Sequence, residues 1–304
     1  MSCFSKIING VRFLYDSDFR WIYLANRGRF DGLDDETFLY RKYKACMGKE
    51  LNLASPKTFN EKLQWLKLYD RKPEYTVMVD KYAVRKYIAD TIGEEYLIPL
   101  LGVWDNPDDI DFDALPNQFV LKCNHNSGLG MCICKDKSKL DIAKVKAELR
   151  KGLRQDYYLT GREWPYKNVP RRIVCEKYMQ NANDEDLTDY KFFCFNGEPK
   201  IMYIACDHAK QPKPDFFDMN FDKINMRMED PNSEEIHEKP KYFEEMKLIA
   251  RKLSSNTCFL RVDFYVINNK LYFGELTFFH MSGFAPVNPE EWSYKLGDWI
   301  KLPE

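Results

Sequence analysis

The stretch from Cys258 to Phe278, CFLRVDFYVINNKLYFGELTF, consists of two alternating segments separated by a short polar turn. In the first segment, apolar residues alternate with Arg261 and Asp263, and in the second, Glu275 and Thr277 share one parity. Because alternate residues of a strand point to opposite faces, this pattern predicts an antiparallel hairpin. The four polar side chains are then expected on one face of it.

The register of this hairpin brings two acids together. With residues 268–270 as the loop, Asp263 is expected opposite Glu275, and Arg261 opposite Thr277. Opposed like charges destabilise a sheet unless a cation lies between them, and Mg²⁺ uses carboxylate oxygens alongside substrate phosphates. The pattern fits either a magnesium site or a solvated hairpin in which Arg261 bridges two acids.

The composition of the 304-residue chain limits its class. Of its residues 44% are hydrophobic and 31% charged, with a formal net charge of −1. The length suits one large domain or two small ones, and the charge balance argues against a nucleic-acid partner. No window approaches the ~18 apolar residues of a membrane helix, and no signal-peptide core is apparent. Nine irregularly spaced cysteines indicate a reducing compartment, so we expect a cytoplasmic protein.

The N-terminal segment, residues 1–75, is expected to be mainly helical. Thr58 and Glu61 form a capping box that opens one helix, and Asp80 is expected to cap the next helix directly after it. Near the N-terminus, basic residues outnumber acidic ones and lie among apolar residues. That stretch either packs on its own domain, which we favour, or rests peripherally on the inner face of the cell membrane.

Beyond this segment, short apolar runs are separated by turn signals. Phe119–Cys123 and Met131–Cys134 are expected to be paired strands around the loop 124–130. Asn196-Gly197 is a strong hairpin signal between two further strands, whereas residues 212–240 are expected to form a long surface loop. Antiparallel hairpins mixed with helices favour an α+β fold over a doubly wound parallel sheet.

Lys122 lies in an apolar strand just before a loop that contains glycine. The loop amides, with the side chains of Asn124 and Ser127, could cradle phosphate while Lys122 supplies positive charge. Gly128 and Gly130 suit an ordinary hairpin loop equally well, and the chain has no Walker A sequence. Both interpretations of the loop stay open on these residues alone.

Other polar residues follow strand-like runs. Glu176-Lys177-Tyr178-Met179 has a pattern that can line an adenine slot through backbone hydrogen bonds. Asp189 and Lys191 alternate on the next strand and could reach ribose or phosphate, and His280 lies in a loop expected to face the same cleft.

Taken in order, these positions resemble the ATP-grasp superfamily, and within it the teichuronopeptide-biosynthesis (TupA-like) family, over roughly residues 50–304. The resemblance implies two α+β subdomains that hold ATP between antiparallel sheets, after a helical segment. The expected limits are 1–75, 76–175 and 176–304. The motifs that carry the resemblance are SPKTFNEK at 55–62, DKY at 80–82, LKCNHNSG at 121–128, EKY at 176–178, DYK at 189–191, RVDF at 261–264, GELTF at 274–278 and LGDWIKLP at 296–303.

The resemblance also implies a role for individual residues. Many ATP-grasp enzymes have Asn where this chain has Thr277, a weaker metal ligand, and His280 follows where small residues are usual. His280 would then either contact the substrate or fill the loop. The implied roles are phosphate binding for Lys81, Lys122 and Lys191, a loop over the phosphates for Asn124, Ser127 and Gly128, adenine or ribose binding for Glu176, Lys177, Tyr178, Met179 and Asp189, Mg²⁺ binding for Asp263, Glu275 and Thr277, and charge stabilisation by Arg261.

In this superfamily a carboxylate attacks the γ-phosphate of ATP with Mg²⁺ bound, and an amine captures the acyl phosphate. The family context implies a surface polysaccharide, so we expect an amino acid or another amine to be joined to a uronic acid. One alternative is a glycosyltransferase, because Asp111-Phe112-Asp113 and Asp184-Glu185-Asp186 match its D-x-D metal pattern. A phosphotransferase on the same fold and a non-catalytic nucleotide-binding scaffold are the others.

Overall fold

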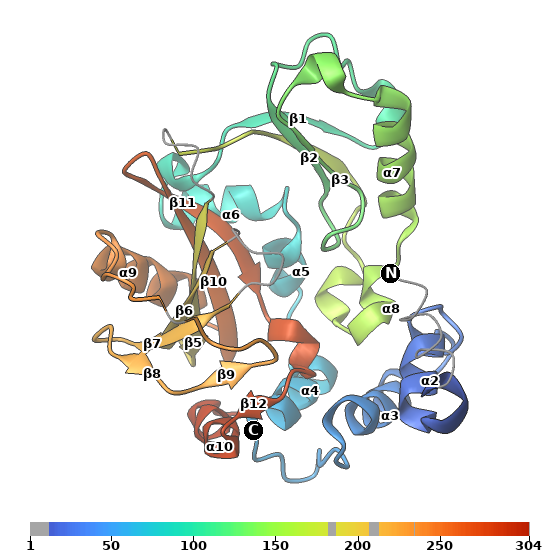
Figure 1. Cartoon of the computed structure of the whole chain (residues 1–304), viewed down its shortest axis with the longest axis vertical. Helices are drawn as coiled ribbons and strands as arrows, with labels where there is room; N and C mark the ends of the chain where they lie inside the picture. Colours follow the sequence, from blue (N-terminus) through green and yellow to red (C-terminus); the bar gives the residue numbers. More distant parts are fainter. Residues whose placement is uncertain (1–11, 182–186, 207–212, 234, 304) are drawn as a thin grey trace.

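Two antiparallel sheets dominate the computed structural model, which describes residues 12–181, 187–206, 213–233 and 235–303 (Figure 1). The smaller sheet has the strand order β1-β4-β2-β3, and the larger has the order β11-β10-β5-β6-β7-β8. The smaller sheet contains β1 (Leu100–Trp104), β2 (Phe119–Cys123), β3 (Met131–Cys134) and β4 (Ile173–Lys177). The larger contains β5 (Thr188–Phe195), β6 (Glu198–Cys206), β7 (Asp215–Asp218), β8 (Lys223–Ile224), β10 (Phe259–Ile267) and β11 (Lys270–Thr277). A separate ladder pairs β9 (Arg227–Met228) with β12 (Val287–Asn288).

Helices cover these sheets and fill the space between them. In Figure 1, α7 lies beside the smaller sheet, α9 covers one side of the larger, and α5 and α6 lie between the two. The α-helices are α2 (Ser17–Ala25), α3 (Asp35–Met47), α4 (Phe59–Tyr69), α5 (Glu74–Val79), α6 (Val84–Thr91), α7 (Ile142–Arg154), α8 (Tyr157–Gly161), α9 (Phe243–Ser254) and α10 (Glu290–Trp299). Short 3₁₀ helices are η1 (Glu94–Tyr96), η2 (Pro107–Asp109), η3 (Lys137–Lys139), η4 (Trp164–Tyr166) and η5 (His280–Gly283).

Each sheet has its own hydrophobic core. In the smaller sheet, Leu121 packs in one buried cluster with Leu149 of α7. In the larger sheet, the rings of Phe192 and Phe243 lie 5.8 Å apart, which joins β5 to α9, and Phe264 of β10 lies 5.8 Å from Phe192. Two cores under two antiparallel sheets confirm the predicted α+β class. The larger sheet is apolar toward α9, so its polar residues lie on the opposite face.

Of the two helix starts predicted from the sequence, that of α4 is confirmed and that of α6 is wrong. Thr58 and Glu61 form the predicted capping box at the start of α4. Asp80 does not open α6, which begins at Val84. Its carboxylate instead accepts hydrogen bonds from a backbone amide two residues on and from Asn124 Nδ2, both at 2.8 Å. Asp80 thus ties this turn to the loop after β2.

The expected surface loop at 212–240 is wrong in part. Its described residues contain β7, which extends the larger sheet beside β6, as well as β8 and β9. Phe216 and Phe217 are both buried in this strand. Their apolar surface outweighs the prolines and acids around them, which suggested a loop. Residues 212 and 234 lie outside the described part of the chain.

In the described part of the basic N-terminal stretch, Trp21 packs on its own chain, whereas Leu14 and Tyr15 are exposed, at 66% and 87%. Trp21 of α2 is stacked on Phe30 at a ring separation of 5.2 Å and lies 5.3 Å from Phe38 of α3. The choice between packing and a membrane contact therefore stays a prediction. Residues 1–11, which carry the rest of the membrane-contact prediction, lie outside the described residues. Within the described ranges, no helix is both long and apolar enough to cross a membrane.

Candidate active site

A row of charged residues follows the face of the larger sheet that turns away from α9. Arg261 and Asp263 alternate with the apolar residues of β10 that face α9. The ladder to β5 places Asp263 beside Lys191. The row consists of Asp189, Lys191, Arg261, Asp263, Glu275 and Thr277.

The turn of the β10–β11 hairpin is shorter than expected. It contains two residues, Asn268 and Asn269, with φ of 51° and 59°. Two residues with positive φ are typical of a type I′ hairpin turn. As a result Ile267 pairs with Lys270, where the sequence suggested Leu271. The register near the turn is therefore one residue away from the prediction.

A bulge restores the expected register at the other end of the hairpin. Between positions 262 and 264 of β10, β11 has one extra residue, so Gly274 and Glu275 together lie opposite Asp263. Beyond the bulge, Arg261 pairs with Thr277 as predicted. If the register of the turn continued without a bulge, Glu275 would pair with Val262 and lie on the face that packs against α9. The bulge thus keeps both acids on the polar face without a direct pair between them.

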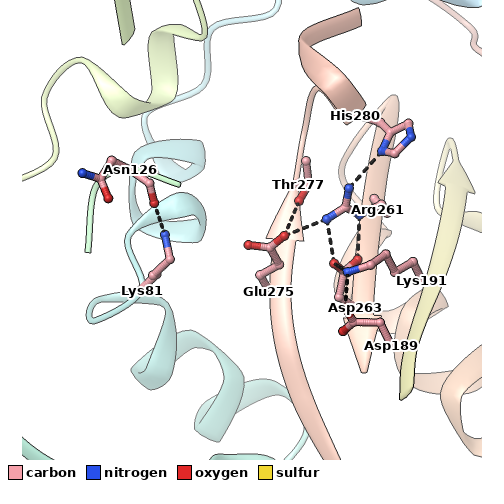
Figure 2. A network of polar contacts seen from close by, with 9 residues as sticks. All are labelled: Lys81, Asn126, Asp189, Lys191, Arg261, Asp263, Glu275, Thr277 and His280. Carbon is pink, nitrogen blue, oxygen red and sulfur yellow. Dashed lines mark hydrogen bonds and ion pairs between the residues drawn. The ribbon is translucent and has the colours of Figure 1, made fainter. Parts of the chain in front are cut away.

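Arg261 joins the two acids (Figure 2). It donates to both oxygens of Asp263, at 2.7 and 2.6 Å, and to Glu275 Oε1 at 2.6 Å. Lys191 Nζ donates to Asp263 Oδ2 at 2.7 Å, and Thr277 Oγ1 donates to Glu275 Oε1 at 3.4 Å. Asp263 is only 1% exposed. Arg261 does bridge the acids, but in a buried network and not on a solvated hairpin.

The buried charges in this network compensate one another. Burial acts to raise the pKa of Asp263, but the charges of Arg261 and Lys191 outweigh it and hold that pKa below its usual value. Burial acts to lower the pKa of Lys191, yet the carboxylates of Asp263 and Asp189 raise it above its usual value. These groups are therefore ionised at neutral pH, and the face presents fixed charges.

His280 lies beneath Arg261 and is 5% exposed, which corrects the expectation that it faces the cleft. Its Nδ1 is 2.9 Å from Arg261 Nη1, and its ring packs edge-on against Phe193. Burial, followed by the charge of Arg261, lowers the pKa of His280 well below its usual value. The ring is thus neutral and accepts through Nδ1. His280 is a positioning residue that orients Arg261.

The smaller sheet contributes a second group of charges. Lys122 Nζ on β2 donates to Glu176 Oε2 on β4 at 2.6 Å, and Arg85 of α6 donates to Glu176 Oε1 at 3.4 Å. These residues line a cavity of about 190 Å³ that also includes Tyr265 and Glu275 from the larger sheet. The cavity therefore lies between the two sheets.

The loop after β2 closes one side of this space. Lys81 donates to the backbone carbonyl of Asn126 (Figure 2), and burial lowers the pKa of Lys81. Ser127 lines a neighbouring cavity. Gly128 has φ of 80°, with open space where a side chain would start. The loop is thus attached at Lys81 and open at its tip.

Asn124 has a different role from the predicted one. Its side chain is fully buried and donates 2.8 Å hydrogen bonds to Asp80 and to the carbonyl of Pro170. Its Oδ1 accepts from the backbone amide of Arg172 at 2.7 Å. With these partners the side chain anchors the loop and does not reach a phosphate, which corrects the expectation from the sequence.

Three adjoining cavities follow the cleft. The first, of about 340 Å³, is lined by residues 177–179 at the end of β4. It shares Lys122 and Glu176 with the 190 Å³ cavity between the sheets. That cavity shares Lys81 and Glu275 with a third one of about 380 Å³. A continuous path thus leads from the end of β4, past the lysines, to the charged row on the larger sheet.

The row of charged residues contains the oxygen ligands that a magnesium ion needs. Asp263, Glu275 and Thr277 supply oxygen donors, which Mg²⁺ prefers. Both oxygens of Asp263 accept from Arg261 and Lys191, whereas the Glu275 side chain is 46% exposed. Among the described residues no cluster of three or more His, Cys, Asp or Glu could hold a metal. An ion here fits if nucleotide phosphates and water complete its ligands.

A family comparison agrees with this arrangement. The model of the TupA-like ATP-grasp family matches residues 61–301. The chain belongs to this family. The TupA-like ATP-grasp fold predicted from the motifs is therefore confirmed. The matched residues include both sheets, and with them every strand that lines one of the three cavities. No curated protein matches the chain significantly.

Solved structures similar to this TupA-like chain are distant ligases and a synthase. D-alanine–D-alanine ligase from Bacillus anthracis complexed with ATP is 18% identical, with 74% of this chain and 63% of that chain covered and a TM-score of 0.45. D-alanine–D-alanine ligase from Helicobacter pylori is 15% identical, with 80% of this chain and 69% of that chain covered and a TM-score of 0.43. N5-carboxyaminoimidazole synthase from Aspergillus clavatus, in complex with ADP and 5-aminoimidazole ribonucleotide, is 11% identical, with 83% of this chain and 52% of that chain covered and a TM-score of 0.40. This chain thus spans less than two thirds of the first of them.

Several cavity residues of the TupA-like chain were not singled out from the sequence. Arg85 lies four positions after Lys81, a spacing that could have placed both on one helical face. Tyr166 and Tyr265 line the cavity between the sheets. Glu163 lies between short helices, where no periodic pattern marks it.

Proposed function

We propose that the chain is an ATP- and Mg²⁺-dependent carboxylate–amine ligase that acts in the biosynthesis of a cell-surface polysaccharide. The observation that carries the proposal is the line of three cavities, with the Arg261 network at the junction of the second and third. A nucleotide in the first two cavities would point its phosphates at this network. A second substrate would then enter through the third.

The nucleotide side is supported by the residues along the first two cavities. Backbone groups and side chains at Lys177, Tyr178 and Met179 offer an adenine slot, and Lys135 lies 5.7 Å from the ring of Tyr178. Lys122 and Lys81 supply positive charge farther along the cleft. Since phosphates attract such cations, the charge order in the cleft matches that of a nucleotide.

At the reaction centre, Asp263, Glu275 and Thr277 would hold the magnesium ion, which neutralises phosphate charge when bound. Arg261 would donate to the oxygens of the group being transferred, where negative charge develops. His280 would fix the orientation of Arg261 through its hydrogen bond. The charge of Lys191 would keep Asp263 ionised. These residues would support attack of a substrate carboxylate on the γ-phosphate, after which an amine captures the acyl phosphate.

The substrate class rests on the family. Membership in the TupA-like group supports a uronic acid as the carboxylate and an amino acid or another amine as its partner. The described D-x-D match gives no support to glycosyl transfer, because Asp111 accepts hydrogen bonds from the backbone amides of Asp113 and Ala114 and caps a turn. The second match, 184–186, lies outside the described residues. We expect the enzyme to act in the cytoplasm or at the inner face of the membrane.

The proposal is tested by incubating the full chain with ATP, Mg²⁺, glucuronate or galacturonate, and hydroxylamine. A ligase releases ADP and forms a hydroxamate, because hydroxylamine captures the acyl phosphate. A phosphotransferase gives ADP with a stable phosphoester, and a scaffold gives neither product. Glu275→Gln should abolish both products, whereas Glu244→Gln on α9, far from the cavities, should leave them unchanged. ADP release without hydroxamate for every uronic acid would contradict the ligase assignment.

A further inference from the structure

The third cavity extends past the charged row into a pocket that no motif in the sequence marked. At its near end lie Arg261, Glu275 and Thr277. The same cavity is lined by Lys42 of α3 and by Glu163, which precedes η4. We call the part of the cavity around these two residues the acceptor pocket. The other residues that line the cavity are Lys81, Ser127, Tyr157, Thr160, Tyr166, Phe279, Met281, Ser282 and Phe284.

Glu163 brings a buried carboxyl group to this pocket. It is 6% exposed, and its Oε1 accepts a hydrogen bond from Ser282 Oγ. Burial raises the pKa of Glu163, while the positive charges of Lys67 and Lys42 oppose this. A carboxylate has about four acceptor positions. Within the described ranges, Ser282 is the hydrogen-bond donor that reaches it, so Glu163 has capacity for a ligand donor.

Lys42 brings a buried positive charge to the same pocket. It is 9% exposed, and its Nζ donates to the carbonyl of Thr160 and lies 4.9 Å from the ring of Phe284. An ammonium group has three N–H donors, so further donors remain beside the pocket. Among the described residues, Lys42 and Glu163 form no ion pair within 4.0 Å. The pocket thus holds an amine and a carboxyl group that are not paired with each other. Burial lowers the pKa of Lys42 and raises that of Glu163.

The pocket is preformed by a strained segment. Met281 and Ser282 of η5 have φ of 47° and 54°, a left-handed conformation that costs about 1–2 kcal/mol per residue outside glycine. Lys67, which is fully buried, holds this segment by donating to the carbonyls of Ser282 and Gly161 at 2.8 and 2.7 Å. Backbone strain of this kind occurs where a structure holds a ligand-binding conformation.

We propose that the acceptor pocket binds the amine substrate, and that this substrate is a zwitterionic α-amino acid with its ammonium group at Glu163 and its carboxylate at Lys42. The role as amine substrate rests on the proposed ligase function, whereas binding of the free amino acid does not. The volume of about 380 Å³ is large enough for a single amino acid beside the charged row.

Binding measurements separate the two charges of the ligand. We suggest calorimetric titration of the full chain, with Mg²⁺ and a non-hydrolysable ATP analogue, using the free L-amino acids one at a time. For the tightest binder, its decarboxylated amine and its deaminated acid are then titrated. The wild type should bind the amino acid at least tenfold more tightly than either analogue. Lys42→Met should remove the preference over the amine, and Glu163→Gln the preference over the deaminated acid.

Matched controls come from two residues of α4 that do not line the cavity, Glu61 and Lys62. Lys62 Nζ donates to the carbonyl of Ile300 much as Lys42 does to that of Thr160, and Glu61 is a second carboxylate outside the pocket. Lys62→Met and Glu61→Gln should bind like the wild type, and circular dichroism checks that each variant is folded. If a pocket variant fails to fold, the three wild-type affinities still decide the question.

Five results are informative. The proposal is overturned if the wild type binds no amino acid, or binds an analogue equally well, or if the folded pocket variants keep both preferences. Specific amino-acid binding by a chain that forms no hydroxamate supports the pocket assignment and refutes the proposed reaction. Hydroxamate formation without any amino-acid preference supports the proposed reaction and refutes the pocket assignment.

Discussion

The two sheets that enclose the cleft hold their charges differently. On the larger sheet, Arg261, Asp263 and Lys191 lie on paired strands and are joined by bonds of 2.6–2.7 Å in a buried network. On the smaller sheet, Lys122 and Glu176 form one partly exposed pair. The larger sheet therefore fixes its charges before any ligand binds, whereas Lys122 can exchange Glu176 for a phosphate. Under the proposed function, we therefore expect substitutions on the larger sheet to reduce catalysis and stability, and substitutions on the smaller sheet to reduce nucleotide affinity.

The largest effect should follow Asp263→Asn. The change leaves Arg261 and Lys191 buried without their shared carboxylate, and breaking a buried pair costs about 3–5 kcal/mol. We expect a clear fall in the free energy of unfolding and a loss of ADP formation of about 10³-fold. Urea unfolding and ADP release measure the two effects. Asp222→Asn, at an exposed position between β7 and β8, is the control. Equal stability and activity of the two variants would contradict a role for buried, fixed charges on the larger sheet.

Lys122→Met should affect affinity more than stability. Loss of a charge-assisted hydrogen bond of about 1.5–3 kcal/mol predicts a KM for ATP raised by about 10- to 100-fold. The free energy of unfolding should change less than in Asp263→Asn, since the Lys122 side chain is 24% exposed. Steady-state kinetics with varied ATP tests this, with Lys144→Met on the exposed side of α7 for comparison. An unchanged KM would remove Lys122 from the nucleotide site.

Substitution of His280 should weaken the dependence of stability on pH. The pKa of His280 is lowered in the folded chain, so below pH 6.5 the unfolded chain takes up a proton that the folded one does not. Stability is then lost as pH falls below 6.5, by up to about 1.4 kcal/mol per pH unit, and is unaffected above it. Between pH 7.5 and 5.5, His280→Gln should lose roughly 1 kcal/mol less than the wild type in urea unfolding. Parallel losses would exclude this role for His280.

The smallest effect should come from the third oxygen donor. An amide oxygen is a better magnesium ligand than a hydroxyl, so Thr277→Asn should lower the half-saturating Mg²⁺ concentration about two- to threefold. Thr277→Val should raise it by a similar factor. ADP release at fixed ATP and varied Mg²⁺ provides the measurement. Identical curves for the three proteins would place the ion away from Thr277.

Local patterns were enough to predict much of this fold. Alternation along β10 marked the polar face that carries Arg261 and Asp263, Asn196-Gly197 marked the β5–β6 hairpin, and Thr58 with Glu61 marked the start of α4. Each signal depends on residues that are close together in the sequence, so each can be recognised without a tertiary structure.

The remaining features depend on contacts between distant segments. Asn124 was assigned to phosphate because its partner, the backbone at Arg172, lies 48 positions away. His280 looked like a cleft residue because nothing local indicates that Arg261 covers it. The acceptor pocket joins Lys42 to the segment around Thr160, 118 positions later. Such contacts become visible only once the sheets are assembled.

The bulge at Gly274 and Glu275 also bears on how this family can vary. Because the bulge absorbs one residue, the half of the hairpin near Arg261 has a register of its own, separate from that of the Asn268-Asn269 turn. A change in the length of the turn would therefore leave the acids on the polar face, as long as the bulge and the pairing beyond it are kept. Deletion of Gly274 would remove the bulge and place Glu275 directly opposite Asp263 on the polar face, so the two acids would form the like-charge pair that the bulge now avoids.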